Sequence, residues 1–127
     1  MRFILAVVLG LHGVAHLVGF VSSWRLATLA ELPYKTTILG GHGDVGDIGI
    51  RVIGMLWLAA AAGLMVAAVA VTTRTDWALR VAGFAIVGSL LLCAAGWPDS
   101  RIGLFVNVGL ALLLATGMRL AVFASTL

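Results

Sequence analysis

Two histidines one helical turn apart are the first residues in this sequence that could carry chemistry. His12 and His16 lie in an apolar stretch, and a spacing of four places both imidazoles on the same face of a helix. An imidazole can hydrogen-bond between helices, transfer a proton near neutral pH, or bind a metal ion. An HxxxH pair supplies only two ligands, so a metal or haem site would need another, such as His42. These three interpretations remain open at this stage.

A second polar group surrounds the start of the last apolar stretch. Asp99 precedes that stretch, where a carboxylate can cap a helix and favours the helix dipole. Arg101 is expected to anchor the helix end at the interface or to pair with Asp99. Asn107 lies inside the stretch, about 10–12 Å below its end at 1.5 Å per residue, and His16 is at a similar depth from the corresponding end of the first stretch. If the two stretches are neighbours, the side chains of His16 and Asn107 can meet.

The elements that position these residues follow from composition. The chain has 127 residues, of which 62% are hydrophobic, and it carries only eight basic and five acidic side chains. The mean hydropathy is +1.17. A soluble domain needs more polar residues than this to cover its surface. The single cysteine excludes an internal disulfide, and the absence of a basic cluster argues against nucleic-acid binding.

Four apolar segments are each about as long as the roughly 20 residues that a helix needs to cross a bilayer. We expect one integral membrane domain over residues 1–127, with an all-α fold: a four-helix transmembrane bundle in the cell membrane. The expected spans are 3–22, 48–71, 77–96 and 101–123, with a long loop over 23–47. The two other connections are short, which favours antiparallel neighbours.

The long loop has a pattern of its own. Apolar residues recur between Trp24 and Leu32 and end at Pro33, which predicts a short helix lying in the membrane interface. Asp44 and Asp47 are expected to cap the second span at its N-terminus. Asp47 and Arg51 are four residues apart, a spacing that favours an ion pair.

Small and polar residues form stripes on three of the expected spans. Such stripes allow membrane helices to approach closely and to hydrogen-bond. The stripes comprise His12, His16, Gly19 and Ser23; Ser89, Cys93 and Gly96; and Gly103, Asn107 and Ala111. On this reading, Asn107 is first of all a residue that bonds two helices.

The stretches LHGVAHLVGF and WPDSRIG, the latter followed by Asn107, resemble those of small bacterial four-helix integral membrane proteins of uncharacterised function. The resemblance implies a four-helix fold and a bacterial cell membrane, but no reaction. The motif positions correspond to His12, Gly13, His16, Gly19, Trp97, Asp99, Arg101, Gly103 and Asn107.

The sequence supports three functional hypotheses. The first is a polar intramembrane pocket that binds a small lipophilic ligand or handles protons. The second is a structural or accessory subunit of a larger membrane complex, in a homo- or hetero-oligomer. The third is a metal- or haem-binding membrane protein. The candidate ligand-binding residues of the pocket are His12, His16, Asn107, Asp99, Arg101 and His42. The expected surroundings are the lipid bilayer, with no nucleic acid, and the sequence names no cofactor.

Overall fold

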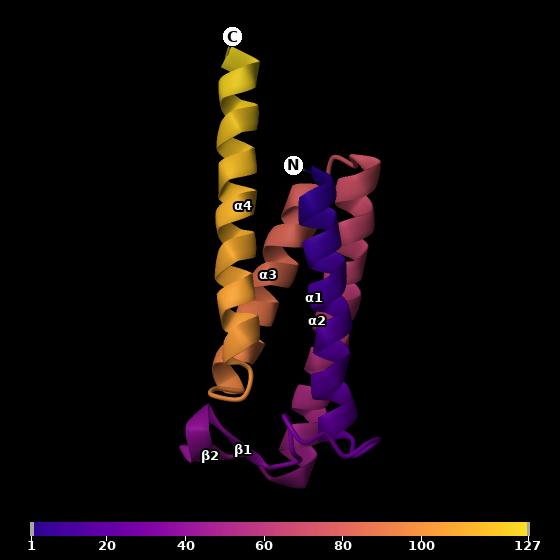
Figure 1. Ribbon diagram of the computed structural model, residues 1–127, viewed down its shortest axis with the longest axis vertical. Helices are drawn as coiled ribbons and strands as arrows, with labels where there is room; N and C mark the ends of the chain where they lie inside the picture. Colours follow the sequence, from indigo (N-terminus) through magenta and orange to yellow (C-terminus); the bar gives the residue numbers. More distant parts are fainter. Residues whose placement is uncertain (1, 127) are drawn as a thin grey trace.

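The protein is an all-α bundle of four helices (Figure 1). A computed structural model describes the backbone of residues 2–126 and the side chains up to Arg119. The helices are α1 (Arg2–Ser23), α2 (Gly46–Thr73), α3 (Ala78–Ala95) and α4 (Arg101–Thr126). Each begins and ends within three residues of the bounds expected from the sequence. Within the described residues, four helices are long and apolar enough to cross a membrane.

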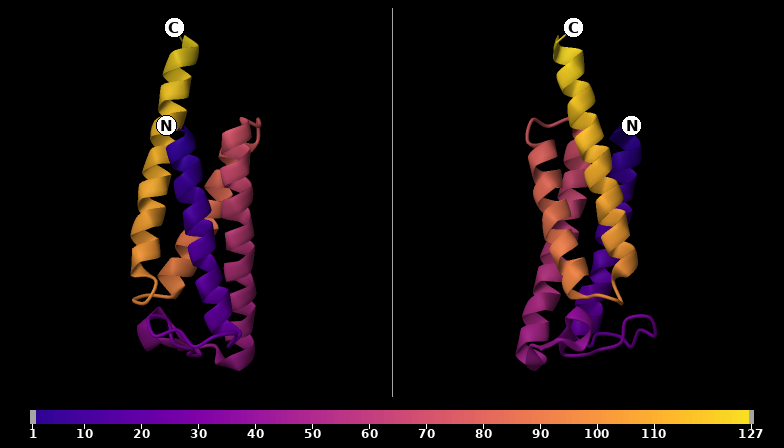
Figure 2. Two further views of the ribbon diagram at one scale, coloured as in Figure 1. Left: turned by 45° about the vertical axis from the view of Figure 1, so that its right-hand side comes forward. Right: turned by 90° about the vertical axis from the view of Figure 1, so that its left-hand side faces the viewer.

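The helices pack unequally on one another. α1 lies along α2 and makes its largest contact there, whereas its contact with α4 is much smaller. α3 packs against both α2 and α4, the two helices to which short connections join it. Two further views show that α4 continues beyond the ends of the other helices (Figure 2). The bundle is therefore closed on the α1–α2 side and looser between α1 and α4.

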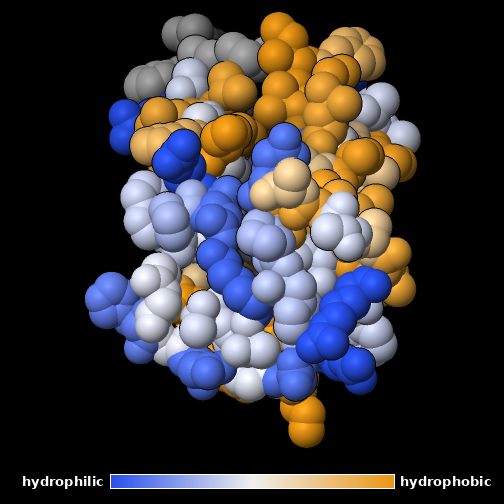
Figure 3. Space-filling model, turned by 60° about the horizontal axis from the view of Figure 1, so that its bottom comes forward, coloured by the Kyte–Doolittle hydropathy of each residue, from blue (hydrophilic) through white to orange (hydrophobic). Residues whose placement is uncertain are grey.

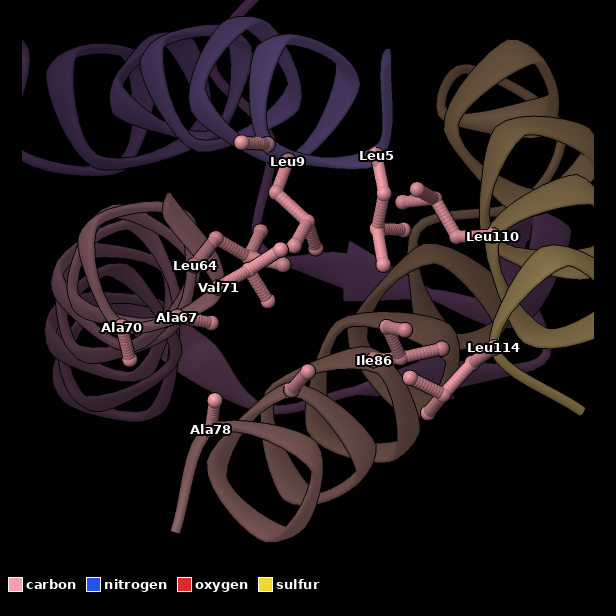
Figure 4. Close-up of a cluster of buried hydrophobic side chains, with 12 residues drawn as sticks. Leu5, Leu9, Leu64, Ala67, Ala70, Val71, Ala78, Ile86, Leu110 and Leu114 are labelled. Atoms are coloured by element: carbon pink, nitrogen blue, oxygen red, sulfur yellow. The ribbon is translucent and has the colours of Figure 1, made fainter. Parts of the chain in front are cut away.

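An apolar core fills the half of the bundle that holds the start of α1. Leu9 and Leu64 are fully buried, and Leu110 of α4 is nearly so. Figure 4 shows these side chains pointing toward one another from three helices. Small residues on α2 and α3, such as Ala67 and Ala82, are also fully buried and let the helices approach closely. Dispersion contacts between close-packed side chains hold this half together.

Glycines bring α1 and α2 into direct contact. A Cβ on Gly13 would lie 3.1 Å from the carbonyl oxygen of Ala61. A Cβ on Gly54 would lie 2.7 Å from the Cβ of Ser23, which is attached to the α1 backbone and cannot turn away. Larger residues at these positions would push the two helices apart.

The loop before α2 contains no helix over Trp24–Leu32, so the interfacial helix expected there is wrong. Turns and bends cover this segment instead. The chain reverses directly after α1, where Arg25 takes a left-handed conformation and the Leu26 N–H donates to the carbonyl of Val21. The Ser22 hydroxyl then donates to the carbonyl of Leu32 at 2.8 Å. These bonds fold the segment back on the helix end, so it is tied to α1 and does not form a helix of its own.

Polar contacts hold the rest of the loop. Asp47 accepts bonds from Arg25, at 3.0 Å, and from the Tyr34 hydroxyl, so the pair expected between Asp47 and Arg51 does not form. The Arg51 guanidinium instead lies over the indole of Trp24. A short hairpin follows, in which β1 (Thr37–Ile38) pairs with β2 (Gly43–Asp44) and each strand has two residues. A 3-10 turn, η1 (Leu39–Gly41), lies at its tip. Viewed from this end, hydrophilic side chains gather over the loop and the helix ends (Figure 3).

Candidate functional site

The two histidines of α1 are buried inside the bundle. His12 is 6% exposed and His16 is 2% exposed, and their ring centroids are 4.5 Å apart in an edge-on arrangement. The His16 ring also lies 4.9 Å from the indole of Trp57 on α2. The helical spacing of four thus brings the two imidazoles together as the sequence indicated.

Ser89 of α3 is the centre of the polar network that the histidines enter. Its Oγ lies 2.6 Å from Nε2 of His16, 3.2 Å from Nε2 of His12 and 2.8 Å from Nδ2 of Asn107. Ser89 and Asn107 are fully buried. Three helices therefore meet at one hydroxyl group, and His16 and Asn107 are linked through it.

The hydrogen-bond partners assign the tautomers of both histidines. Nδ1 of His16 lies 2.9 Å from the carbonyl oxygen of His12, and a carbonyl can only accept, so Nδ1 carries the proton. In neutral His16, Nε2 is then an acceptor, and the Ser89 hydroxyl donates a hydrogen bond to it. Because the one hydroxyl hydrogen of Ser89 is used in that bond, the Ser89 oxygen accepts hydrogen bonds from the Asn107 amide and from Nε2–H of His12. With both rings neutral, this is the arrangement in which every bond of the network has one donor and one acceptor.

The same reasoning fixes the orientation of the Asn107 amide. Its NH₂ group donates to Ser89 and lies 3.6 Å from the sulfur of Cys93. Turning the amide over would place its oxygen against a hydroxyl oxygen whose proton is already engaged with His16. The Asn107 oxygen Oδ1 is buried and has no hydrogen-bond partner among the described residues. It is a spare acceptor beside the network.

A cavity of about 470 Å³ lies next to this network, between α1 and α4. Its wall is mostly apolar, with Val8 and Leu11 from α1 and Val106 from α4. His12 and His16 interrupt this wall and bring imidazole groups to the cavity. Ser89 and Asn107 are not part of the wall and support it from behind. A Cβ on Gly103 would lie 2.7 Å from the Cys93 sulfur and 3.6 Å from Cε1 of His12, so α4 approaches the histidines closely at this glycine.

The end of the cavity near the loop is polar. Asp99, Ser100 and Glu31 line it there. Asp99 pairs with Lys35 of the loop, not with Arg101 as the sequence suggested. The Asp99 oxygen that faces the Lys35 ammonium is buried. This contact joins the loop to the start of α4.

Two of the expected site residues lie apart from the cavity. Arg101 is exposed at the first turn of α4 and does not line the cavity. His42 is also exposed, and its Nδ1 bonds with the carbonyl of Leu39 in its own turn at 2.7 Å. The backbone N–H of Gly40 donates to the carbonyl of Trp97 at 2.8 Å, so this turn rests on the α3–α4 connection. His42 therefore serves the loop and is not a third member of the histidine pair.

A metal site would need further ligands beside the two histidines. In the described part of the chain, no group of three or more His, Cys, Asp and Glu side chains is placed to hold a metal ion. His12 and His16 direct their assigned N–H groups to protein acceptors. What the site offers chemically is a hydrogen-bonding imidazole pair at the edge of an apolar cavity.

The sequence predicts several residues of this network but not its centre. The sequence pattern assigns Ser89 to a stripe of small and polar residues and not to the candidate site, and it gives Trp57 no role. The available signal for Ser89 is that it is a hydroxyl inside an apolar span, on a stripe that also holds Cys93. That signal gives no indication that both histidines converge on it.

Comparisons with models of protein families, with curated proteins and with solved structures found no match for this chain. The resemblance in the two histidine- and tryptophan-containing stretches therefore stays an expectation, and the function has to be argued from the geometry of the site.

Proposed function

We propose that this chain is a multi-pass integral membrane protein of a bacterial cell membrane that binds a small lipophilic molecule between α1 and α4. The observation that carries the proposal is the cavity of about 470 Å³ with His12 and His16 on its otherwise apolar wall. Ligand sites typically have volumes of about 300–1,000 Å³ and a few polar groups that orient the ligand. This cavity has both properties.

The position of the cavity favours entry from the lipid. Leu11 and Ile102 line it on α1 and α4, and these residues are 67% and 74% exposed on the outside of the bundle. A wall built from outward-facing residues is open toward the acyl chains when the helices span a bilayer. A lipophilic molecule dissolved there can reach the histidines without passing through water.

The support behind the histidines favours binding over a purely structural role. Packing alone needs a hydrogen bond between helices, which Ser89 and Asn107 already provide between α3 and α4. The imidazoles add polar surface on the cavity side. Polar side chains within membrane spans usually face protein or a functional cavity, because exposing them to lipid is unfavourable.

The test is to fill the cavity and measure what remains bound. The protein is extracted gently from native membranes, and co-purifying small molecules are identified by native mass spectrometry and solvent extraction. Ala15→Phe places a ring into the cavity from α1, whereas Val14→Phe places one on the neighbouring exposed position, which does not line it. We expect a bound lipophilic molecule with the parent chain and Val14→Phe, and its loss with Ala15→Phe.

Retention of the same molecule by Ala15→Phe would place binding elsewhere on the protein. A parent chain that releases no small molecule and binds none added to it would contradict the proposal. A second protein at fixed stoichiometry in place of a ligand would favour the accessory-subunit hypothesis.

A further inference from the structure

The polar atoms on the cavity wall differ in how much hydrogen-bonding capacity they have left. Both nitrogens of His16 are engaged, one with the carbonyl of His12 and one with Ser89. His12 uses Nε2 on Ser89, and its Nδ1 has no hydrogen-bond partner in the described part of the chain. Among the ring nitrogens of these two cavity-lining histidines, Nδ1 of His12 is therefore the one left without a partner in the described residues.

The network fixes the character of that nitrogen. Nε2 of His12 carries the ring proton because the Ser89 hydroxyl already donates its hydrogen bond to His16 and can only accept from His12. In a neutral ring, the other nitrogen is then an acceptor. The reverse arrangement requires an added proton on His16, and an imidazolium buried among apolar helices is disfavoured.

The loop end of the cavity also offers acceptors. The Ser100 hydroxyl donates its proton to the carbonyl of Cys93 at 2.6 Å, so its oxygen is left to accept. Asp99 and Glu31 contribute carboxylates. Trp57 also lines the cavity, and its indole N–H is a donor. A hydroxyl group, which both donates and accepts, is compatible with such a donor as well.

From this distribution we infer that the ligand is a lipophilic alcohol or phenol whose hydroxyl group donates a hydrogen bond to Nδ1 of His12. The inference rests on the proposed function and names the class of molecule that the same site selects. A ketone, quinone or ether of the same shape has no proton to donate, and it would leave Nδ1 unpaired in the bound state. Sites built to accept a substrate hydroxyl discriminate against analogues that lack it, because a desolvated acceptor without a partner is unfavourable.

The binding test uses a matched pair of probes. 4-Hexylphenol and 4-hexylanisole have nearly the same shape, and the second has a methyl group in place of the hydroxyl proton. The full-length protein is placed in lipid nanodiscs, and binding is followed by the change in tryptophan fluorescence at equal mole fractions of probe in the lipid, since Trp57 lines the cavity. We expect the phenol to bind about ten-fold more tightly than the ether, as one hydrogen bond predicts.

Variants locate the discrimination. Ala15→Phe should abolish binding of both probes, and Val14→Phe should leave both affinities unchanged. His12→Leu should bring the two affinities together. Because His12→Leu also weakens the network, a second measurement is made on the unmodified protein: nitrogen NMR with ¹⁵N-labelled histidine. Of the two buried histidines, we expect His12 to be protonated at Nε2 and His16 at Nδ1, with the unprotonated nitrogen of His12 shifting when the phenol binds and not when the ether binds.

The outcomes separate this inference from the proposed function. Equal affinities for the two probes, tighter binding of the ether, or a His12 ring protonated at Nδ1 would overturn the hydroxyl inference and leave the binding function in place. Failure of both probes to bind, together with no effect of Ala15→Phe on the co-purified molecule, would overturn the binding function itself.

Discussion

α1 contacts its neighbouring helices differently on its two sides. On the α2 side, glycines bring backbones together, and a Cβ on Gly54 would already collide with Ser23. On the α4 side, a cavity of about 470 Å³ separates α1 from α4, and Ser89 links the two helices by hydrogen bonds to His16 and Asn107. The first interface depends on shape and the second on hydrogen bonds. A polar link can hold helices together while leaving space between them, and a ligand site requires that space.

The largest effect is expected from one added carbon at the close interface between α1 and α2. Gly54→Ala places a Cβ 2.7 Å from that of Ser23, so α1 and α2 must separate. We expect a loss of about 1–3 kcal/mol in the free energy of unfolding, as for other overpacked contacts. Unfolding in mixed detergent with increasing denaturing detergent measures it. Gly109→Ala is the control, because a Cβ there meets nothing within 4 Å. Equal stability of the two variants would show that the helices are not in contact at Gly54.

The second prediction addresses the polar interface. Ser89→Ala removes the group that His12, His16 and Asn107 share, and each then loses a buried partner. Hydrogen bonds between membrane helices average about 0.6 kcal/mol, and we expect a total loss of about 1–2 kcal/mol in the free energy of unfolding. The same detergent titration measures the change.

Thr116→Ala is the matched control for Ser89→Ala. The Thr116 hydroxyl is exposed and bonds with the carbonyl of Leu112 in its own helix, at 2.8 Å. It contributes nothing between helices, so its removal should leave the free energy of unfolding unchanged. If Ser89→Ala were as stable as Thr116→Ala, the network would not hold α3 against α1 and α4.

These interfaces also mark what the sequence could predict. Helix bounds follow from segment length and hydropathy, which are local properties, and they agree with the structure. The facing of His12 and His16 follows from helical periodicity, and the approach of His16 to Asn107 follows from matched depth. Each of these arguments needs only the geometry of one helix and a common membrane frame.

The parts that failed depend on contacts between elements. The short helix expected over Trp24–Leu32 is absent because bonds to the end of α1 fold the segment back. Asp47 pairs with Arg25, although Arg51 has the favoured spacing, because the loop brings Arg25 and Tyr34 to it. The role of Ser89 needs the relative rotation of three helices. Spacing along one chain segment carries no information about any of these.

A smaller effect is expected from the ion pair that joins the loop to the open side of the bundle. Lys35→Gln removes the ammonium that pairs with Asp99 at the loop end of the cavity. The Lys35 side chain is 43% exposed, so the loss in the free energy of unfolding should be no more than about 1 kcal/mol. The change should appear as faster hydrogen exchange at the Gly40 N–H, which donates to the carbonyl of Trp97.

Arg25→Gln is the control for Lys35→Gln, because it breaks an ion pair on the α1–α2 side of the same loop. Exchange at Gly40 should then stay at the parent rate. Equal acceleration by both substitutions would mean that the loop responds as one unit and that Lys35 does not specifically hold it to the α3–α4 connection.

The smallest expected effect is a pH dependence at the start of α2. Asp44 is fully exposed, and its carboxylate accepts the Gly46 N–H at 3.0 Å, which lowers its pKa below the ordinary value of 3.8. A lowered pKa in the folded state means that the bond contributes fully at neutral pH and is lost as the pH falls through that depressed pKa. Hydrogen exchange at Gly46, corrected for its intrinsic pH dependence, should therefore lose protection only in acid. Asp44→Asn keeps an acceptor that does not titrate and should show no such step. A step of the same size in Asp44→Asn would assign the acid sensitivity to another group, and a step at the core amides of α1 and α2 would show that the turn is coupled to the close interface.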